Sequence, residues 1–144
     1  MNVRPSALII KDHAVLTLRY CYGNQEVFAL PGGNPDPGEC LREALVREIG
    51  EEICVEATIG NMVCCGEVIW TEPRKETLHM VFEATITGEP VLDPGQTTAL
   101  EIVWLPLPEV TGKILYPNVG AQIQSYHTLP YSPFIGPIDQ PYVQ

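Results

Sequence analysis

The sequence predicts an α/β fold in a single domain. Of its 144 residues, 45% are hydrophobic and 18% are charged, a balance typical of a globular protein with a buried core. Short segments with strand character outnumber helical ones, and apolar residues recur with helical spacing over residues 39–53. No internal repeat or domain boundary interrupts residues 1–144, so we expect one domain with a proline-rich tail from about residue 128.

Six strands are expected from alternating apolar residues and flanking turn residues. They comprise two strands within 7–20 around a turn at 11–13, and one strand each in 26–31, 64–71, 76–87 and 99–107. Within 76–87, alternation gives a single core face that contains Leu78 and Phe82. His79 is expected on the less buried face, with a substrate contact as its alternative role.

Two helices are expected. Leu41, Leu45, Ile49 and Ile53 recur every fourth residue and form one apolar stripe. Residues 33–38 before it hold two Gly and two Pro with Asn and Asp, which indicates a loop. Residues 115–127 suggest a second helix, weakened by Gly120.

The tail 128–144 is rich in proline and aromatic residues. From Ile114 onward, Asp139 is the only Asp, Glu, Lys or Arg. We therefore expect the tail to lie extended against its own subunit or a neighbouring one, which would form a homodimer.

The first helix carries three acids that need an explanation. Glu48, Glu51 and Glu52 stand at positions i, i+3 and i+4, where like charges repel by a few tenths of a kcal/mol. A solvated face would interleave acids with bases at a spacing of four. Arg47 stands at that spacing from Glu43 and Glu51, but Glu48 and Glu52 have no such partner. Clustered carboxylates suit Mg²⁺ or Mn²⁺, so a metal site stands beside the solvated face as an explanation.

Charge and composition exclude several classes of function. A formal net charge of −10 argues against a nucleic-acid duplex or an anionic membrane as partner, whereas a small phosphorylated molecule could bind through a cation. The five cysteines include no C-x-x-C pair, so reduced thiols are expected rather than a zinc site or disulfides. With no signal-peptide pattern and no apolar run of membrane-spanning length, the chain is expected to be cytoplasmic.

The acidic helix resembles a known family signature. Gly33, Glu39 and the segment Arg47-Glu48-Ile49-Gly50-Glu51-Glu52-Ile53-Cys54-Val55 match the Nudix hydrolase signature in residue type and spacing. The segments ALPGG (29–33), Trp104 to Glu109 and LYP (115–117) are also similar to the family. Cys54 departs from the pattern, because the family has Gly there, where a helix commonly ends in a left-handed residue.

The resemblance implies a fold, a reaction and a set of site residues. The fold would be a Nudix-type α/β/α sandwich with a mixed central sheet, and the reaction would be Mg²⁺- or Mn²⁺-dependent hydrolysis of a pyrophosphate bond. It implies Glu48, Glu51 and Glu52 as metal ligands, with a backbone carbonyl near Gly33 as a further one, and Glu48 or Glu52 as the base. Arg47 would orient Glu39 or its neighbours on the helix, and Glu83 and Glu101 are candidates for an additional ligand or base.

The substrate stays open at this stage. A nucleoside diphosphate linked to another group is expected, either a nucleotide sugar such as ADP-ribose or a nucleoside triphosphate, including oxidised ones. Trp70, Tyr20, Tyr22 and Phe28 could each stack on a base or lie in the core. The alternative function is a non-catalytic module of the same fold that senses nucleotides or binds a partner.

Overall fold

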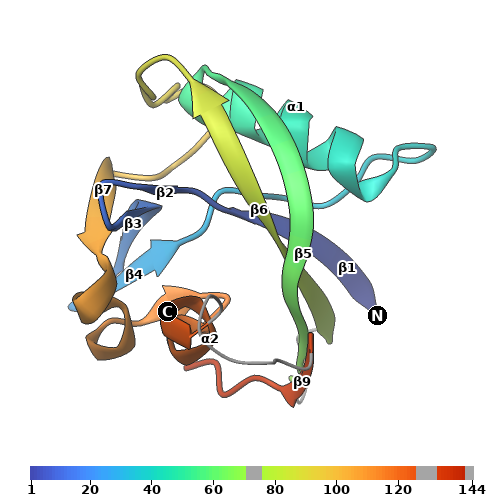
Figure 1. Cartoon of the computed structure of the whole chain (residues 1–144), viewed down its shortest axis with the longest axis vertical. Helices are drawn as coiled ribbons and strands as arrows, with labels where there is room; N and C mark the ends of the chain where they lie inside the picture. Colours follow the sequence, from blue (N-terminus) through green and yellow to red (C-terminus); the bar gives the residue numbers. More distant parts are fainter. Residues whose placement is uncertain (71–75, 126–132, 142–144) are drawn as a thin grey trace.

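The strands of the protein form two sheets, and the principal helix packs beside them. We describe residues 1–70, 76–125 and 133–141 in a computed structural model of the chain (Figure 1). The elements are β1 (Asn2–Leu8), β2 (Ile10–Lys11), β3 (Ala14–Tyr22), β4 (Gln25–Ala29), α1 (Leu41–Ile53), β5 (Glu56–Val68), β6 (Thr77–Thr87), β7 (Glu101–Pro106), a 3-10 helix (Leu107–Gly112), β8 (Leu115–Tyr116), α2 (Gly120–Ser125) and β9 (Phe134–Pro137).

Both sheets are mixed. The first has the strand order β1-β6-β5-β9, and the second has the order β2-β3-β4-β8, with β7 also paired to β3. The β1–β6, β4–β8 and β5–β9 pairs are parallel, and the remaining pairs are antiparallel. This architecture confirms the expected mixed α/β class, and the strands divide between two hydrogen-bonded sheets.

Helix α1 buries the apolar stripe predicted from its sequence. Leu45, Ile49 and Ile53 are fully buried in a cluster that also contains Phe82 of β6. The helix packs against β5 and β1, and its cluster also takes in Leu16 and Leu18 of β3; Figure 1 shows α1 beside β5. None of the helices in the described residues is long and apolar enough to cross a membrane.

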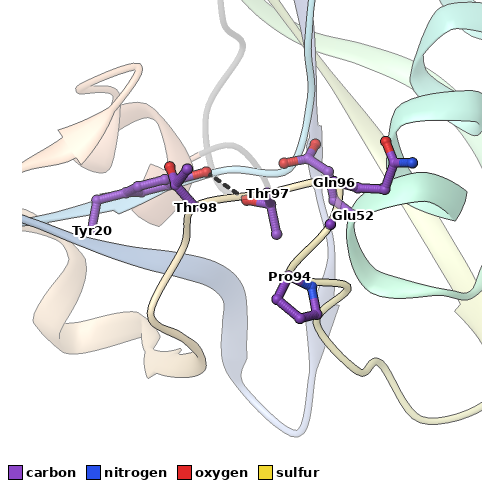
Figure 2. A pocket seen from close by; sticks show the side chains of 7 residues that line it. Tyr20, Glu52, Pro94, Gln96, Thr97 and Thr98 are labelled. Atoms are coloured by element: carbon purple, nitrogen blue, oxygen red, sulfur yellow. Dashed lines mark hydrogen bonds between the residues drawn. The ribbon is translucent and has the colours of Figure 1, made fainter.

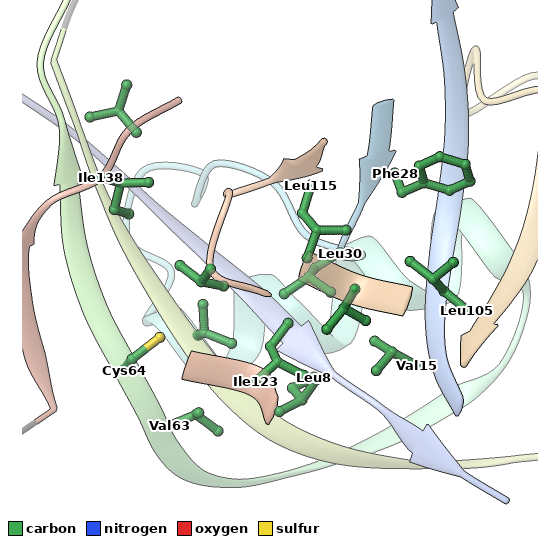
Figure 3. Close-up of a cluster of buried hydrophobic side chains, with 14 residues drawn as sticks. Leu8, Val15, Phe28, Leu30, Val63, Cys64, Leu105, Leu115, Ile123 and Ile138 are labelled. Atoms are coloured by element: carbon green, nitrogen blue, oxygen red, sulfur yellow. The ribbon is translucent and has the colours of Figure 1, made fainter. Parts of the chain in front are cut away.

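Strand β6 is buried on both faces, so the prediction for His79 was wrong. His79 is only 1% exposed, and Val81 on the same face is also buried. Alternation identified one core face, but β6 lies between β1 and β5, and its second face meets another cluster of buried apolar side chains. Figure 3 shows this second cluster, to which Leu115 and Ile123 of the C-terminal part contribute.

The second helix is shorter than the sequence suggested. Residues 115–116 form β8, and α2 covers only Gly120–Ser125; residues 126–127 lie outside the described part. Pro117 follows β8 directly, and a proline disfavours a helical backbone at the residue before it.

The described part of the tail is ordered by packing, as predicted. Strand β9 pairs in parallel with β5, and Ile138 is buried against the core. Gln140 accepts a hydrogen bond from Asn118 N and donates one to Leu115 O, at 2.8 Å each. Residues 128–132 and 142–144 of the predicted tail, and residue 71 of a predicted strand, fall outside the described residues.

Candidate functional site

Arg47 organises the acids around α1. Its guanidinium donates hydrogen bonds to Glu39 at 2.8 and 2.9 Å, to Glu48 at 3.0 Å and to Glu51 at 3.2 Å. The resemblance implied a contact of Arg47 with Glu39 or with its neighbours on the helix, and the guanidinium reaches both. Its hydrogen bonds to Glu39 lower the pKa of that carboxyl to about 2. Glu48 has no base four residues away, but it accepts a hydrogen bond from Arg47, the residue before it in sequence. Glu43 instead accepts a hydrogen bond from Cys40 N at 3.2 Å at the start of the helix.

The loop before α1 fits closely against Glu48. A Cβ atom at Gly33 would lie 2.4 Å from the carboxyl carbon of Glu48, so only glycine leaves that carboxylate in its place. Gly32 is equally confined, since a Cβ there would lie 2.3 Å from the carbonyl oxygen of Pro5. The two glycines let the loop pass between β1 and the acidic face of α1.

Glu52 is the buried member of the three acids. It is 8% exposed, and its Oε1 has no hydrogen-bond partner. Burial raises the pKa of Glu52 to about 7, and the negative charge of Glu48 adds to the shift; the charge of Arg4 opposes it. A carboxylate placed this way is unsatisfied when the protein is free of ligand.

An open pocket of about 350 Å³ lies beside Glu52. Its lining consists of Tyr20, Glu52 and residues 94–98, as Figure 2 shows. The Tyr20 hydroxyl is hydrogen-bonded to Thr97 Oγ1 at 3.1 Å, and the backbone N–H of Asp93 donates to Glu52 O at 3.0 Å. These bonds attach the 93–98 loop to both β3 and the end of α1.

The donor set suits a hard divalent cation that keeps water or phosphate ligands. In the described part of the chain, no three carboxylate, thiol or imidazole groups come close enough together to enclose a metal ion, so the three acids do not form a closed cage. Glu51 is turned toward Arg47 and its side chain is 39% exposed. Mg²⁺ is commonly bound through one or two carboxylates plus water and substrate phosphate. The unpaired Oε1 of Glu52 and the confined carboxylate of Glu48 fit that mode of binding.

The other acids considered from the sequence have partners elsewhere. Glu83 Oε1 accepts a hydrogen bond from Asn61 N at 3.2 Å, and Glu101 pairs with Arg19 at 2.7 Å.

The candidate aromatic residues separate by burial. Phe28 is 5% exposed in the core, and Trp70 packs against the same core cluster. Tyr20 lines the pocket and stacks with Tyr22, at 6.1 Å between ring centroids, and Tyr22 is 42% exposed. Of these four candidates, Tyr20 is therefore the one placed to meet a ligand in the pocket.

Sequence reasoning missed the polar residues that other elements bring to this region. Ser6 of β1 bridges to Gly32, and the charge of Arg4 reaches Glu52. One signal was available: Arg4 is a cation within a strand of a strongly acidic chain. The contribution of residues 93–98 had no comparable signal, because it depends on how that loop packs against α1.

Comparison with known proteins gives a match to a family model and a similar bacterial protein. The family model described as "NUDIX domain" matches residues 3–127. A Bacillus subtilis (strain 168) protein, whose name provisionally describes it as an 8-oxo-dGTP diphosphatase, is 32% identical over 97 residues. That match covers 67% of this chain and 61% of the relative.

Solved structures share the fold. The solution structure of the E. coli ORF135 protein aligns with a TM-score of 0.73 at 23% identity and covers 90% of each chain. The MutT protein from Methanosarcina mazei Go1 aligns with a TM-score of 0.71 at 22% identity, covering 88% of this chain and 92% of that one. Since the family model spans nearly the whole sequence and the fold agrees, the chain belongs to the NUDIX family.

Proposed function

We propose that the protein hydrolyses the pyrophosphate bond of a nucleoside diphosphate linked to a further group, with Mg²⁺ or Mn²⁺ held by Glu48 and Glu52, and by Glu51 once its side chain turns away from Arg47. The observation that carries this proposal is Glu52, a buried carboxylate beside two others, with one oxygen unpaired. Family membership and the adjoining pocket support it. A net charge of −10 makes a cation necessary for any polyphosphate ligand.

Each residue has a distinct part in the proposed reaction. When bound, the metal neutralises phosphate oxygens and lowers the pKa of water. Glu52 or Glu48 takes a proton from the attacking water at a carboxylate oxygen. Arg47 positions Glu48 and Glu51 through its hydrogen bonds, and the backbone carbonyl at Gly33 is a further candidate ligand.

Two substrate classes are compatible with the site and give a common product. Water addition to a nucleotide sugar such as ADP-ribose yields a nucleoside monophosphate and a sugar phosphate. Addition to a nucleoside triphosphate yields a nucleoside monophosphate and pyrophosphate, and the name of the Bacillus subtilis relative favours oxidised triphosphates. Tyr20, which lines the pocket and stacks with Tyr22, provides aromatic surface for the base in either case.

A screen for release of nucleoside monophosphate tests the proposal. Nucleotide sugars and triphosphates, including 8-oxo-dGTP, are incubated with Mg²⁺, with Mn²⁺ or with chelator, and the products are separated by chromatography. We expect metal-dependent turnover that Glu52→Gln lowers by orders of magnitude. The matched variant Glu83→Gln, outside the acid cluster, should keep activity. Turnover that persists in chelator, or that is equal in the two variants, would contradict the proposal.

A further inference from the structure

A second polar cluster lies beside the acids, where β1 and β6 run in parallel. Arg4 and His79 are register partners on these strands. Both contact the ring of Tyr116 on β8: the guanidinium carbon of Arg4 lies 4.8 Å from the ring centroid, and the His79 ring lies edge-on at 5.0 Å. Ser6, two residues after Arg4, points to the same face of β1. The Tyr116 ring thus supports both Arg4 and His79.

The hydrogen-bonding groups of this cluster are unsatisfied. Among described residues, the buried side-chain nitrogen and oxygen atoms without a partner are Arg4 Nη1, Ser6 Oγ, Glu52 Oε1 and both ring nitrogens of His79. They come from β1, β6 and the end of α1. Leaving a buried polar group unpaired is unfavourable, most of all for a charged group, so a ligand that supplied the missing partners would be favoured at this cluster.

Arg4 and Glu52 interact without forming an ion pair. The positive charge of Arg4 acts on the Glu52 carboxylate, yet no ion pair within 4.0 Å joins these two described residues. Each keeps a buried atom without a partner. Two opposite charges that interact without pairing favour a cation beside the carboxylate and an anion beside the guanidinium.

Among the described residues, Arg4 is a cation that acts on Glu52 and keeps a buried nitrogen without a partner. Arg47, by contrast, already donates to three carboxylates. The guanidinium of Arg4 presents planar donors that match phosphate geometry. Beside it, His79 offers one N–H donor in its neutral form.

We propose that Arg4, held against Tyr116 and flanked by His79, binds a phosphate group of the substrate on the side of the diphosphate away from the Glu52 cation. This inference rests on the proposed function, which supplies both the diphosphate and the cation. Arg4 then sets the position of the phosphates relative to the acids. Its loss should therefore lower the affinity for the diphosphate as well as the rate of turnover.

Calorimetric titration of Arg4→Gln with Mg²⁺ alone and with magnesium pyrophosphate tests the assignment. Removing the positive charge near Glu52 should make Mg²⁺ alone bind about twofold tighter or more. The same change should weaken magnesium pyrophosphate about 10- to 100-fold, because a charge-assisted hydrogen bond to phosphate is lost. A merely structural role for Arg4 would weaken both ligands, so the opposite signs are diagnostic.

Arg42→Gln is the matched control. Arg42 also lies over an aromatic ring, 5.2 Å from the Phe82 centroid, but it donates to the backbone carbonyls of Ile59 and Gly60. This variant should bind both ligands within about twofold of wild type, as expected for a surface charge away from the site. If Arg4→Gln unfolds, Arg4→Lys decides instead, since it keeps the charge and loses the planar fork. It should leave Mg²⁺ binding unchanged and weaken magnesium pyrophosphate several-fold.

Two negative results have different meanings. In the first, wild type binds Mg²⁺ normally, and wild type and the folded Arg4 variant bind magnesium pyrophosphate equally well. That result would overturn the role of Arg4 and leave the proposed function intact. Failure of the wild-type protein to bind Mg²⁺ at all would overturn the proposed function and this inference with it.

Discussion

Cys54 occupies a backbone conformation that favours glycine. Its φ is 60° and its ψ is 34°, and its N–H donates to Gly50 O at 3.2 Å, which ends α1 in the left-handed cap expected for the family's glycine. The Cys54→Gly variant should therefore be more stable, by up to about 1 kcal/mol in the free energy of unfolding. Denaturant unfolding measures the change. Cys21→Gly, within β3, is the control and should lose about 0.5–1 kcal/mol; equal losses in both variants would refute the strain at Cys54.

Replacing Glu52 should separate metal binding from stability. In metal-free protein at pH 8, Glu52→Gln removes a buried charge whose pKa is raised by burial and by Glu48. We expect the free energy of unfolding of the variant to exceed that of wild type by a few tenths to about 1 kcal/mol. Added Mg²⁺ should raise the melting temperature of wild type more than that of the variant. Loss of more than about 1 kcal/mol in the variant, with turnover retained, would make the acids structural.

His79 should make the protein sensitive to acid. Burial, assisted by the charge of Arg4, lowers the pKa of His79 to about 3, against about 6.5 in the unfolded chain. Below pH 6.5 the unfolded state binds a proton that the folded state does not. The free energy of unfolding should therefore fall between about pH 6.5 and 3, by on the order of a few kcal/mol.

Unfolding of His79→Gln at pH 7 and pH 4.5 measures this contribution. The groups that face His79 include Arg4 on β1 and Tyr116 on β8, and both are unchanged in the variant. The variant should lose less stability than wild type over this interval. The variant His13→Asn, which removes an exposed histidine, is the comparison for the loss of one imidazole. Identical pH dependence in wild type and His79→Gln would refute the prediction.

At the scale of elements, the loop 30–40 and helix α1 act as one unit. Gly33→Ala would drive a methyl group into the Glu48 carboxylate. We expect weaker Mg²⁺ binding and at least about tenfold slower turnover, because the carboxylate must leave its place. The unfolding free energy should change by less than about 1 kcal/mol, since only the end of one flexible side chain has to move. Gly112→Ala, where a Cβ meets nothing within 4 Å, should leave metal binding and activity unchanged. Wild-type turnover by Gly33→Ala would show that Glu48 can move freely.

Helix α1 could be predicted from the sequence, whereas the cluster of Arg4 and His79 could not. Helix α1 was predictable because the period of four and the acid spacing are local properties that tertiary packing does not alter. The cluster of Arg4 and His79 was not, because it depends on the parallel register of strands far apart in sequence. The same cause explains the error at His79: alternation shows that a strand has two faces, but only the topology shows that both are covered.

At the scale of the whole molecule, the tail is part of the fold. Ile138 is 9% exposed, and its N–H donates to Glu67 O at 2.7 Å. Ile138→Ala should lower the free energy of unfolding by about 2–4 kcal/mol, because it leaves a cavity against the core. Val91→Ala is the control, since Val91 is 62% exposed and should change stability by less than about 0.5 kcal/mol. Equal stability of the two variants in denaturant would show that the tail is dispensable.

The pairing of β1 with β6 has a consequence for biosynthesis. Val3 pairs with Leu78, and β9 joins the same sheet at Cys65 through Phe134. A nascent chain emerging from the ribosome therefore holds its first strand unpaired until β6 has been translated, and β5 keeps one open edge until residue 137 has left the exit tunnel. Unpaired strand edges are sites of aggregation, and contacts distant in sequence form slowly. The interval before these strands close is the period in which a newly made chain would depend most on chaperones.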